Sequence, residues 1–301
     1  MNATQLHSIF TDEQSAFQYA FKMDLLYNDG ECEKCGDHYG VYSDKHKPFG
    51  CFLKCQKCGC KKSILHNSIF TRSKLPMNKV FHLLYCWAIQ LSRDQTVHEC
   101  KVAPDTVTNF FQSFRQACVG WLEDDGQKPI GGPGKTVEID ESLMSTRKNH
   151  AGRVLSQQWI FGGICRETKE KFVMQVPDRT SETLLPIIEE HILPETTISS
   201  DAWRAYNNVS ELDSNYEHEV VNHSKNFVNP VTKAHTQNVE RMWREVKRVK
   251  RRYEGINSKD INAHIAEYLW RDRNGVNMSN SFTKAVKSLR TPSIATTAGG
   301  L

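Results

Sequence analysis

The chain has 301 residues, of which 39% are hydrophobic and 25% are charged, a composition typical of a globular protein with room for two or three domains. No apolar run approaches the roughly 20 residues that a membrane-spanning helix needs, and the first residues lack the pattern of a signal peptide, so no membrane partner is expected. The net charge of +4 is too small to indicate nucleic-acid binding by itself, and local clusters of basic residues are more informative.

The first predicted domain, residues 1–30, consists of an N-terminal helix over 11–27. Thr11 is a suitable N-cap, and acidic residues follow it in the first turn. Apolar residues then recur at helical spacing, which favours an ordinary packing helix.

The second predicted domain, residues 31–74, is a zinc ribbon. Cys32 and Cys35 form one Cys-x-x-Cys pair, Cys55 and Cys58 form a second, and a glycine follows each pair. Two intervening residues let both thiolates of a pair reach one tetrahedral ion, and the glycine permits the turn that directs them. Because no secretory signal is visible, this spacing favours a metal over disulfides.

The ribbon is expected to hold one structural Zn²⁺, which has no open coordination position and takes no part in chemistry. Cys51 and Cys60 lie outside the paired spacing and are interpreted as bystanders. The alternative is a chance grouping of free cysteines.

Residues 75–122 are expected to be helical and to form a helix-turn-helix-like DNA-binding domain. Pro76 suits a first helical turn, Thr96-Val-His-Glu99 has the form of a capping box, and Pro104 can begin a third, longer helix. A short helix, a tight turn and a longer helix are typical of DNA-binding modules, although a plain three-helix module gives the same pattern. The polar residues of the third helix that suit contacts with DNA are Thr106, Asn109, Gln112 and Arg115.

Residues 123–135 concentrate glycine, proline and charge and are predicted to be a linker. An α/β domain is predicted over 136–275, and a flexible tail over 276–301. Within 136–275 the expected order is β-β-β-α-β-α-β-α, which makes the whole chain a multidomain α/β protein. The expected strands are 136–143, 159–165, 171–176, 196–201 and 216–221, and the expected helices are 181–193, one beginning at 202, 235–252 and 258–271.

Three acids stand at particular places in this order. Asp140 is late in the first strand, Asp201 ends the fourth, and Glu240 lies on the helix after the fifth. The first and fourth strands are expected to be neighbours, so the three carboxylates converge and repel one another unless cations bind between them. Oxygen ligands favour two Mg²⁺ or Mn²⁺ ions, which suit in-line phosphoryl transfer.

Other acids compete for these roles. Glu138 is the most serious rival of Asp140, because residues two apart in a strand point to the same face. The remaining competitors are Glu141, Asp178 and Glu245.

The helix over 235–252 has an apolar stripe beside a line of charged residues. Glu240 is followed along that line by Arg244, Lys247 and Arg251, which suit contacts with DNA phosphates next to the carboxylate. The basic run Lys247–Arg252 also suits a nuclear-localisation signal, and a solvated charged face remains the alternative for the outermost residues.

Several motifs together resemble the DDE motif of cut-and-paste transposases, most closely the Merlin superfamily and its bacterial insertion-sequence relatives. They are the strand-end Asp140, the stretch Ser200–Tyr206 and the stretch His235–Glu240. Asp140-Glu-Ser with a basic loop containing Arg147, Lys148 and Arg153, the N-terminal ribbon and the passage Asn67–Pro76 are also similar to that group. The resemblance covers roughly residues 10–275 of the chain.

The resemblance implies an RNase H-like mixed-sheet catalytic domain with Asp140, Asp201 and Glu240 as metal ligands. His235 and Asn238 would help to orient the scissile phosphate or the attacking water. The implied reaction is hydrolysis at the transposon ends followed by joining of the 3′-hydroxyl to target DNA. The implied partners are double-stranded DNA, as terminal inverted repeats and target, and further copies of the chain in a homodimer or higher oligomer.

Two other functions remain open from the sequence. One is a transposase-derived, sequence-specific DNA-binding protein without cleavage activity, and the other is a zinc-ribbon RNA nuclease. The expected location is the nucleus in a eukaryote, and otherwise the cytoplasm or nucleoid.

Overall fold

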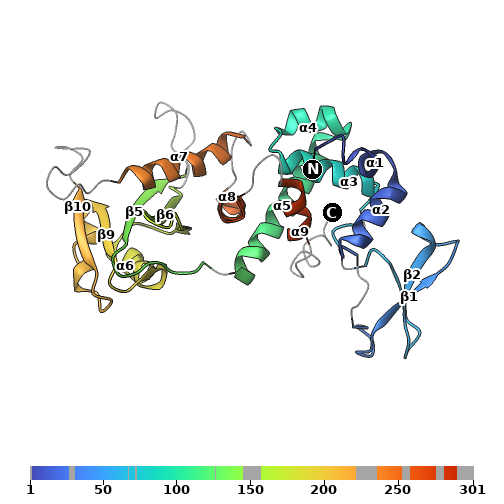
Figure 1. Ribbon diagram of the computed structural model, residues 1–301, viewed down its shortest axis with the longest axis horizontal. Helices are drawn as coiled ribbons and strands as arrows, with labels where there is room; N and C mark the ends of the chain where they lie inside the picture. Colours follow the sequence, from blue (N-terminus) through green and yellow to red (C-terminus); the bar gives the residue numbers. More distant parts are fainter. Residues whose placement is uncertain are drawn as a thin grey trace. The chain divides into compact units, whose positions relative to one another are not determined.

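A computed structural model of the protein describes residues 2–26, 31–66, 68–71, 73–125, 127–144, 157–221, 236–252, 258–275 and 281–289. The chain divides into two compact units (Figure 1). Unit 1 comprises Met1–Trp121 with Asn274–Leu301, and unit 2 comprises Leu122–Arg273. None of the helices in the described ranges has the length and apolar character needed to cross a bilayer.

Unit 1 contains a small antiparallel sheet with strand order β1-β2-β3. The strands are β1 (Tyr39–Ser43), β2 (Cys51–Cys55) and β3 (Lys61–Ser63). Gly36 and Gly59, one after each cysteine pair, both have φ of +73°, a left-handed conformation that glycine adopts without steric cost. The glycine turns expected from the sequence are therefore present at both pairs.

The helices of unit 1 begin with α1 (His7–Thr11) and α2 (Glu13–Lys22). The predicted cap at Thr11 is wrong by one residue. Asp12 is the N-cap of α2, because its carboxylate accepts a hydrogen bond from Ser15 N at 2.7 Å, whereas the Thr11 hydroxyl donates to His7 O.

Three further helices follow, as predicted: α3 (Met77–Ala88), α4 (Arg93–Cys100) and α5 (Pro104–Asp125). The capping box was assigned to the wrong residues. Ser92 and Gln95 form it, with Gln95 N donating to Ser92 Oγ at 3.2 Å and Ser92 N donating to Gln95 Oε1 at 2.9 Å. Thr96 lies inside α4 instead, where its hydroxyl donates to Ser92 O.

A C-terminal helix completes the core of unit 1, so the prediction of a flexible tail is wrong for part of 276–301. Helix α9 (Ser281–Ser288) packs against α3. The Phe282 ring, 1% exposed, contacts the rings of Phe10, Tyr19, Phe81 and Tyr85 at centroid distances of 6.0 to 6.4 Å.

Unit 2 is built on a five-stranded mixed sheet with the order β10-β9-β5-β6-β7. The predicted first and fourth strands, β5 and β9, are indeed neighbours and run parallel. β9 and β10 are also parallel, whereas β5, β6 and β7 form an antiparallel meander. The strands are β5 (Thr136–Leu143), β6 (Trp159–Cys165), β7 (Lys171–Val176), β9 (Thr197–Asp201) and β10 (Glu217–Val221).

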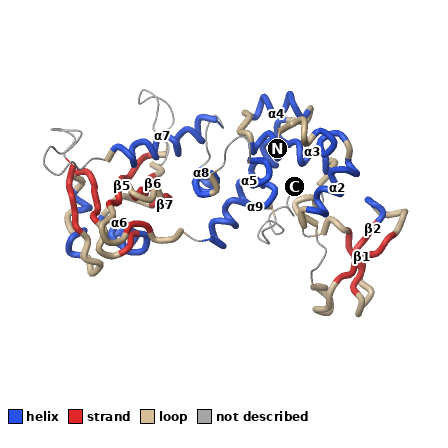
Figure 2. Tube along the Cα trace, viewed as in Figure 1, coloured by secondary structure: helices blue, strands red, loops and turns tan. Residues whose placement is uncertain are grey.

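Helices cover both faces of this sheet. Leu184 and Ile188 of α6 (Ser181–His191) pack with Val137, Ile139 and other residues on one face. On the other face, α7 (Gln237–Arg252) and α8 (Ile261–Arg273) pack over Ile160, Ile164 and Val173. Figure 2 shows α7 running along β5 and β6, in agreement with the contacts between these elements. A strand alternates its side chains between the two faces, so even-numbered residues of β5 face α7.

Two further expectations for unit 2 are corrected. The helix expected from residue 202 is replaced by two short 3-10 helices, Arg204–Tyr206 and Val209–Glu211. The predicted linker 123–135 is structured in part, because α5 continues to Asp125 and β4 (Ile130–Gly131) pairs with β8 (Ile192–Leu193).

Candidate functional site

Asp140 and Asp201 lie at matching positions on neighbouring strands. The paired register of β5 and β9 ends with Glu138 opposite Ser199, and two more residues along both strands bring Asp140 level with Asp201. The two carboxylates are also close enough to interact electrostatically, since the negative charge of Asp201 raises the pKa of Asp140. The expectation that the two strands are neighbours is therefore confirmed, and Asp140 lies within β5 beside the end of β9.

Asp140 is held by helix α7. The Trp243 indole N–H donates to Asp140 Oδ2 at 2.8 Å, and the Trp243 side chain is almost fully buried. Gly162, opposite Asp140 on β6, makes this approach possible, because a Cβ there would lie 2.6 Å from Phe172 O and 3.1 Å from the Trp243 ring. Trp243 belongs to the apolar stripe expected on this helix and packs in the core, and its hydrogen bond to Asp140 is an additional finding.

Burial and like charges act together on Asp140. Desolvation first, then the charge of Glu141, and to a smaller extent Asp201, raise the pKa of Asp140 to about 7, although the Trp243 hydrogen bond opposes the change. A buried carboxylate beside other carboxylates is stabilised in its ionised form by a bound cation. The all-oxygen donor set therefore fits Mg²⁺ or Mn²⁺.

Glu141 occupies the opposite face of β5. It accepts a hydrogen bond from the Tyr206 hydroxyl and pairs with the Arg179 guanidinium at 3.4 Å. Burial raises the pKa of Glu141, as does the charge of Asp201. The Arg179 guanidinium in turn stacks over the Trp203 ring at 3.9 Å. Glu141 is thus close to Asp140 and Asp201, but its own carboxylate is engaged with Tyr206 and Arg179.

Glu138, the strongest competitor of Asp140, anchors the start of α7. Its carboxylate is fully buried and accepts from Asn238 N at 2.8 Å, Val239 N at 3.1 Å and Asn238 Nδ2 at 2.7 Å. Arg166 Nε donates to the same carboxylate at 2.7 Å. These bonds satisfy amides that a helix N-terminus leaves without partners and fix where the first turn of α7 begins.

The residues expected around Glu240 are only partly described. Glu240 lies exposed on the first turn of α7, and the Asn238 side chain is engaged with Glu138. Among the described residues, Asp140, Asp201 and Glu240 are not gathered closely enough to form a compact ligand group. His235 lies outside the described residues, as do Arg147, Lys148 and Arg153 of the basic loop.

The remaining competitors have local roles. Asp178 accepts hydrogen bonds from Thr180 N and from the hydroxyls of Thr180 and Thr183 at the start of α6. Glu245 pairs with Arg241 one turn away on α7, at 3.6 Å.

The cations of α7 divide into two groups. Arg241, Arg244 and Arg248 are exposed and, with Glu245, line a shallow hollow. Lys247 instead turns toward the sheet, where its Nζ donates to Ser142 Oγ at 2.6 Å. The side chain of Arg251 lies outside the described part of the helix. The exposed cations Arg241 and Arg248 were missed by the sequence analysis, although spacings of three and four residues from Arg244 indicate the same face.

The residues of α5 that were predicted to contact DNA differ in how exposed they are. Asn109 and Gln112 are exposed, and Thr106 is half-buried. Arg115 was expected on the same polar face, and this is wrong, because Arg115 is buried with 7% of its surface exposed. Helical periodicity places Arg115 beside Phe111 and Phe114, which are both in the core.

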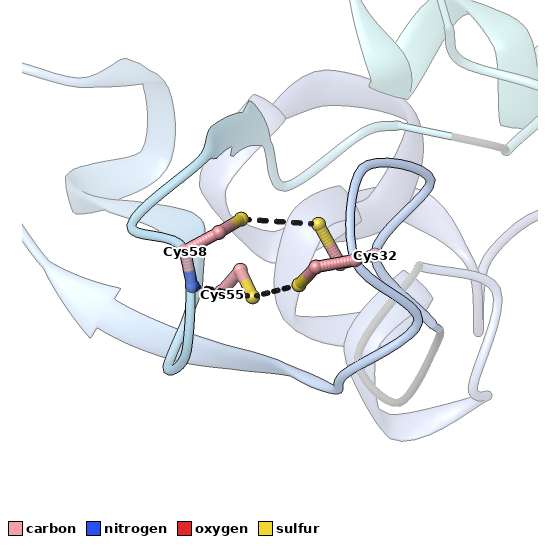
Figure 3. Close-up of side chains that lie close together, drawn as sticks. Cys32, Cys55 and Cys58 are labelled. Atoms are coloured by element: carbon pink, nitrogen blue, oxygen red, sulfur yellow. Dashed lines mark hydrogen bonds between the residues drawn. The ribbon is translucent and has the colours of Figure 1, made fainter.

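Four cysteine side chains converge in the ribbon. The Sγ atoms of Cys32, Cys35, Cys55 and Cys58 all lie within 4.8 Å of one another. Cys32 Sγ is 3.5 Å from Cys58 Sγ, and Cys35 Sγ is 3.4 Å from Cys55 Sγ (Figure 3). Thiolates that share a tetrahedral zinc lie about 3.8 Å apart, given Zn–S bonds of about 2.3 Å. The cluster can therefore hold zinc, and Cys51 and Cys60 are not part of it.

The chain is similar to known transposase sequences. A family model described as an ISXO2-like transposase domain matches residues 127–273. An uncharacterized transposase-like protein of Haemophilus influenzae (strain ATCC 51907 / DSM 11121 / KW20 / Rd) is 30% identical over 104 residues, which cover 34% of this chain and 80% of that protein.

The mixed sheet, its paired carboxylates and these matches agree with one another. The chain belongs to the family of DDE insertion-sequence transposases with an ISXO2-like transposase domain.

Proposed function

We propose that this chain is a cut-and-paste DNA transposase that hydrolyses the phosphodiester at transposon ends and joins the freed 3′-hydroxyl to target DNA. The observation that carries the proposal is the proximity of Asp140 on β5 to Asp201 at the end of the neighbouring strand β9, inside the segment that matches the family model. Unit 2 is then an RNase H-like catalytic domain, with Glu240 of α7 as the third acid.

The proposed ligands of two Mg²⁺ or Mn²⁺ ions are Asp140, Asp201 and Glu240. When bound, such ions would activate the attacking oxygen and stabilise charge on the leaving oxygen. The Trp243 indole orients Asp140, and the Glu138 carboxylate fixes the start of α7, on which Glu240 lies. Both are positioning residues in this scheme.

Substrate binding is assigned to two surfaces. Arg241, Arg244 and Arg248 on the exposed side of α7 suit DNA phosphates next to Glu240. Lys247, bonded to Ser142, is placed at the edge of that surface. In unit 1, α4 and α5 have the short-then-long arrangement of a helix-turn-helix. Thr106, Asn109 and Gln112 are its proposed contacts, and a zinc-filled Cys32–Cys58 ribbon supports the module.

The test is a cleavage assay with purified full-length protein, Mg²⁺ and DNA carrying the genomic ends that flank this gene. We expect the wild type to cut and Asp201→Asn to lose activity by several orders of magnitude while binding the DNA equally well. Asp178→Asn is the matched control, because Asp178 is an exposed acid that bonds Thr180 just before α6, and it is expected to cut normally.

If the wild type and Asp201→Asn both bind and neither cuts, the proposal fails in favour of a DNA-binding protein without cleavage activity. If both proteins cut equally well, Asp201 is not a ligand of the catalytic metal ions.

A further inference from the structure

A second group of metal-binding side chains lies in the helical part of unit 1, away from the ribbon. His82 and Cys86 are four residues apart on α3, and Cys100 is the last residue of α4. Residues four apart share one face of a helix, so both α3 side chains point to the end of α4. Their ligand atoms and the Cys100 Sγ all lie within 4.8 Å of one another.

The distance between the sulfurs is compatible with a shared metal. Cys86 Sγ is 3.7 Å from Cys100 Sγ, close to the roughly 3.8 Å between two thiolates on tetrahedral zinc and much longer than a disulfide of about 2.05 Å. Both cysteines are fully buried, and the side chain of His82 is 16% exposed. Thiolate and imidazole ligands together are typical of zinc sites.

The neighbouring charges suit a divalent cation. Glu99 Oε1 lies 3.5 Å from His82 Nε2, and a carboxylate at that nitrogen favours a proton there, which leaves Nδ1 with the lone pair that a metal needs. Lys79 Nζ donates to Cys100 O at 3.0 Å. Two thiolates neutralise a divalent ion, and the Glu99 and Lys79 charges neutralise each other.

We propose that His82, Cys86 and Cys100 form a second zinc site, with three protein ligands and water in the fourth position. The ion would join α3 to the end of α4, immediately before the turn at Lys101 that leads to α5. It would therefore fix α4, the first helix of the proposed helix-turn-helix, against α3. The site is independent of the ribbon and of catalysis.

The experiment is elemental analysis of full-length protein purified under reducing conditions with zinc. We expect two zinc ions per chain in the wild type and one in the double variant Cys86→Ala/Cys100→Ala. The ribbon variant Cys32→Ala/Cys35→Ala should also retain one. Cys118→Ala removes a buried thiol from α5 in the same unit and should retain two.

Cobalt absorption reports on this site in a protein whose α3 and α4 residues are all unaltered. Co²⁺ added to the zinc-depleted ribbon variant should produce thiolate-to-cobalt absorption, which Cys86→Ala/Cys100→Ala in the same background abolishes. Glu99→Gln should weaken zinc binding at this site about tenfold, as expected for a group that orients a ligand.

One zinc in the wild type that disappears with the ribbon variant overturns the proposal. Absence of cobalt absorption in the ribbon variant does so too, as does recovery of Cys86 and Cys100 as a disulfide from freshly purified protein. If the wild type holds a single zinc that is lost only with Cys86→Ala/Cys100→Ala, this site is supported, and the ribbon holds no zinc.

Discussion

Asp140 combines burial with a neighbouring negative charge, and this combination gives the residue a measurable signature. Its pKa of about 7 in the folded chain lies well above the value of 3.8 that applies without the fold. At a pH between these values the folded chain retains a proton that the unfolded chain releases. Asp140 therefore lowers the free energy of unfolding as the pH rises from about 4 to about 7, by roughly 1.4 kcal/mol for each pH unit in that range.

We predict that Asp140→Asn makes the metal-free protein more stable at pH 8, by a few kcal/mol, and about equally stable at pH 4. The free energy of unfolding of unit 2, followed by hydrogen exchange of β5 amides at both pH values, measures the effect. Mg²⁺ at pH 8 should stabilise the wild type and leave Asp140→Asn unchanged. A variant with the same pH dependence as the wild type would show that Asp140 is ionised in the folded chain at neutral pH.

The acids of β5 show what a sequence can and cannot reveal about single residues. Alternation placed Glu138 and Asp140 on the same face, and the structure agrees, since both contact α7. The different roles of the two acids depend on hydrogen-bond partners about 100 residues away, which no local pattern contains. The burial of Arg115 was likewise not predicted, because composition does not tell which polar residue of a helix lies against the core.

At the scale of elements, the position of α7 depends on one buried carboxylate. Glu138 accepts hydrogen bonds from the first turn of α7 and from Arg166, so it joins the helix to the sheet. Breaking a buried charge pair by removing one partner typically costs about 3–5 kcal/mol.

We predict that Glu138→Gln destabilises unit 2 by about 3 kcal/mol or more, because an amide group replaces an acceptor that faces several donors. Hydrogen exchange of the amides of 238–246 should increase ahead of those in β6. Glu245→Gln, which alters an exposed i, i+4 pair on the same helix, should change stability by less than about 0.5 kcal/mol. Unchanged protection of α7 in Glu138→Gln would contradict the anchoring role.

The exposed face of α7 gives a second prediction at this scale. Arg244→Ala should weaken binding to DNA of any sequence and reduce the slope of log K against log salt by about 0.9, as expected for one lost phosphate contact. Binding isotherms at several salt concentrations measure this slope. Lys169→Asn is the control, because it removes an exposed cation from the turn between β6 and β7. Equal slopes for Arg244→Ala and the wild type would place the DNA elsewhere.

Elements with a strong local pattern were predicted closely. β5, β6 and β7 begin and end at the expected residues, because apolar residues alternate with polar ones at the start of β5 and follow one another in β6 and in most of β7. The two 3-10 helices after Asp201 were not predicted, since polar residues in short turns have no distinct period. α9 did carry a signal. Phe282, Ala285, Val286 and Leu289 repeat at helical spacing, but the small and polar residues around them suggested a tail.

At the scale of the whole molecule, the division into two units separates the four-cysteine cluster of the ribbon from the five-stranded sheet. The ribbon strands are short, and four thiols occupy the place where a larger domain would have an apolar core. Unit 2 has an extensive apolar core on both faces of its sheet.

We predict that a strong zinc chelator raises hydrogen exchange across residues 31–63 by orders of magnitude and leaves β5, β6 and β9 unchanged. Mass spectrometry of peptides from the full-length protein measures both regions in one sample, and excess zinc should reverse the effect. A chelator that exposes the β5–β9 sheet as well would mean that the two units do not fold independently.

The anchoring of α7 also has a consequence for the growing polypeptide. Arg166 follows Glu138 by 28 residues, whereas the α7 amides that complete the shell of this carboxylate follow by 100 and 101. At about 5–20 residues per second, the ribosome makes Arg166 within a few seconds and reaches α7 only after roughly 5–20 s. The nascent β-meander can therefore neutralise its buried acid early. The Trp243 indole that donates to Asp140 is synthesised after all five strands of the sheet, so a chain interrupted before α7 lacks that hydrogen bond.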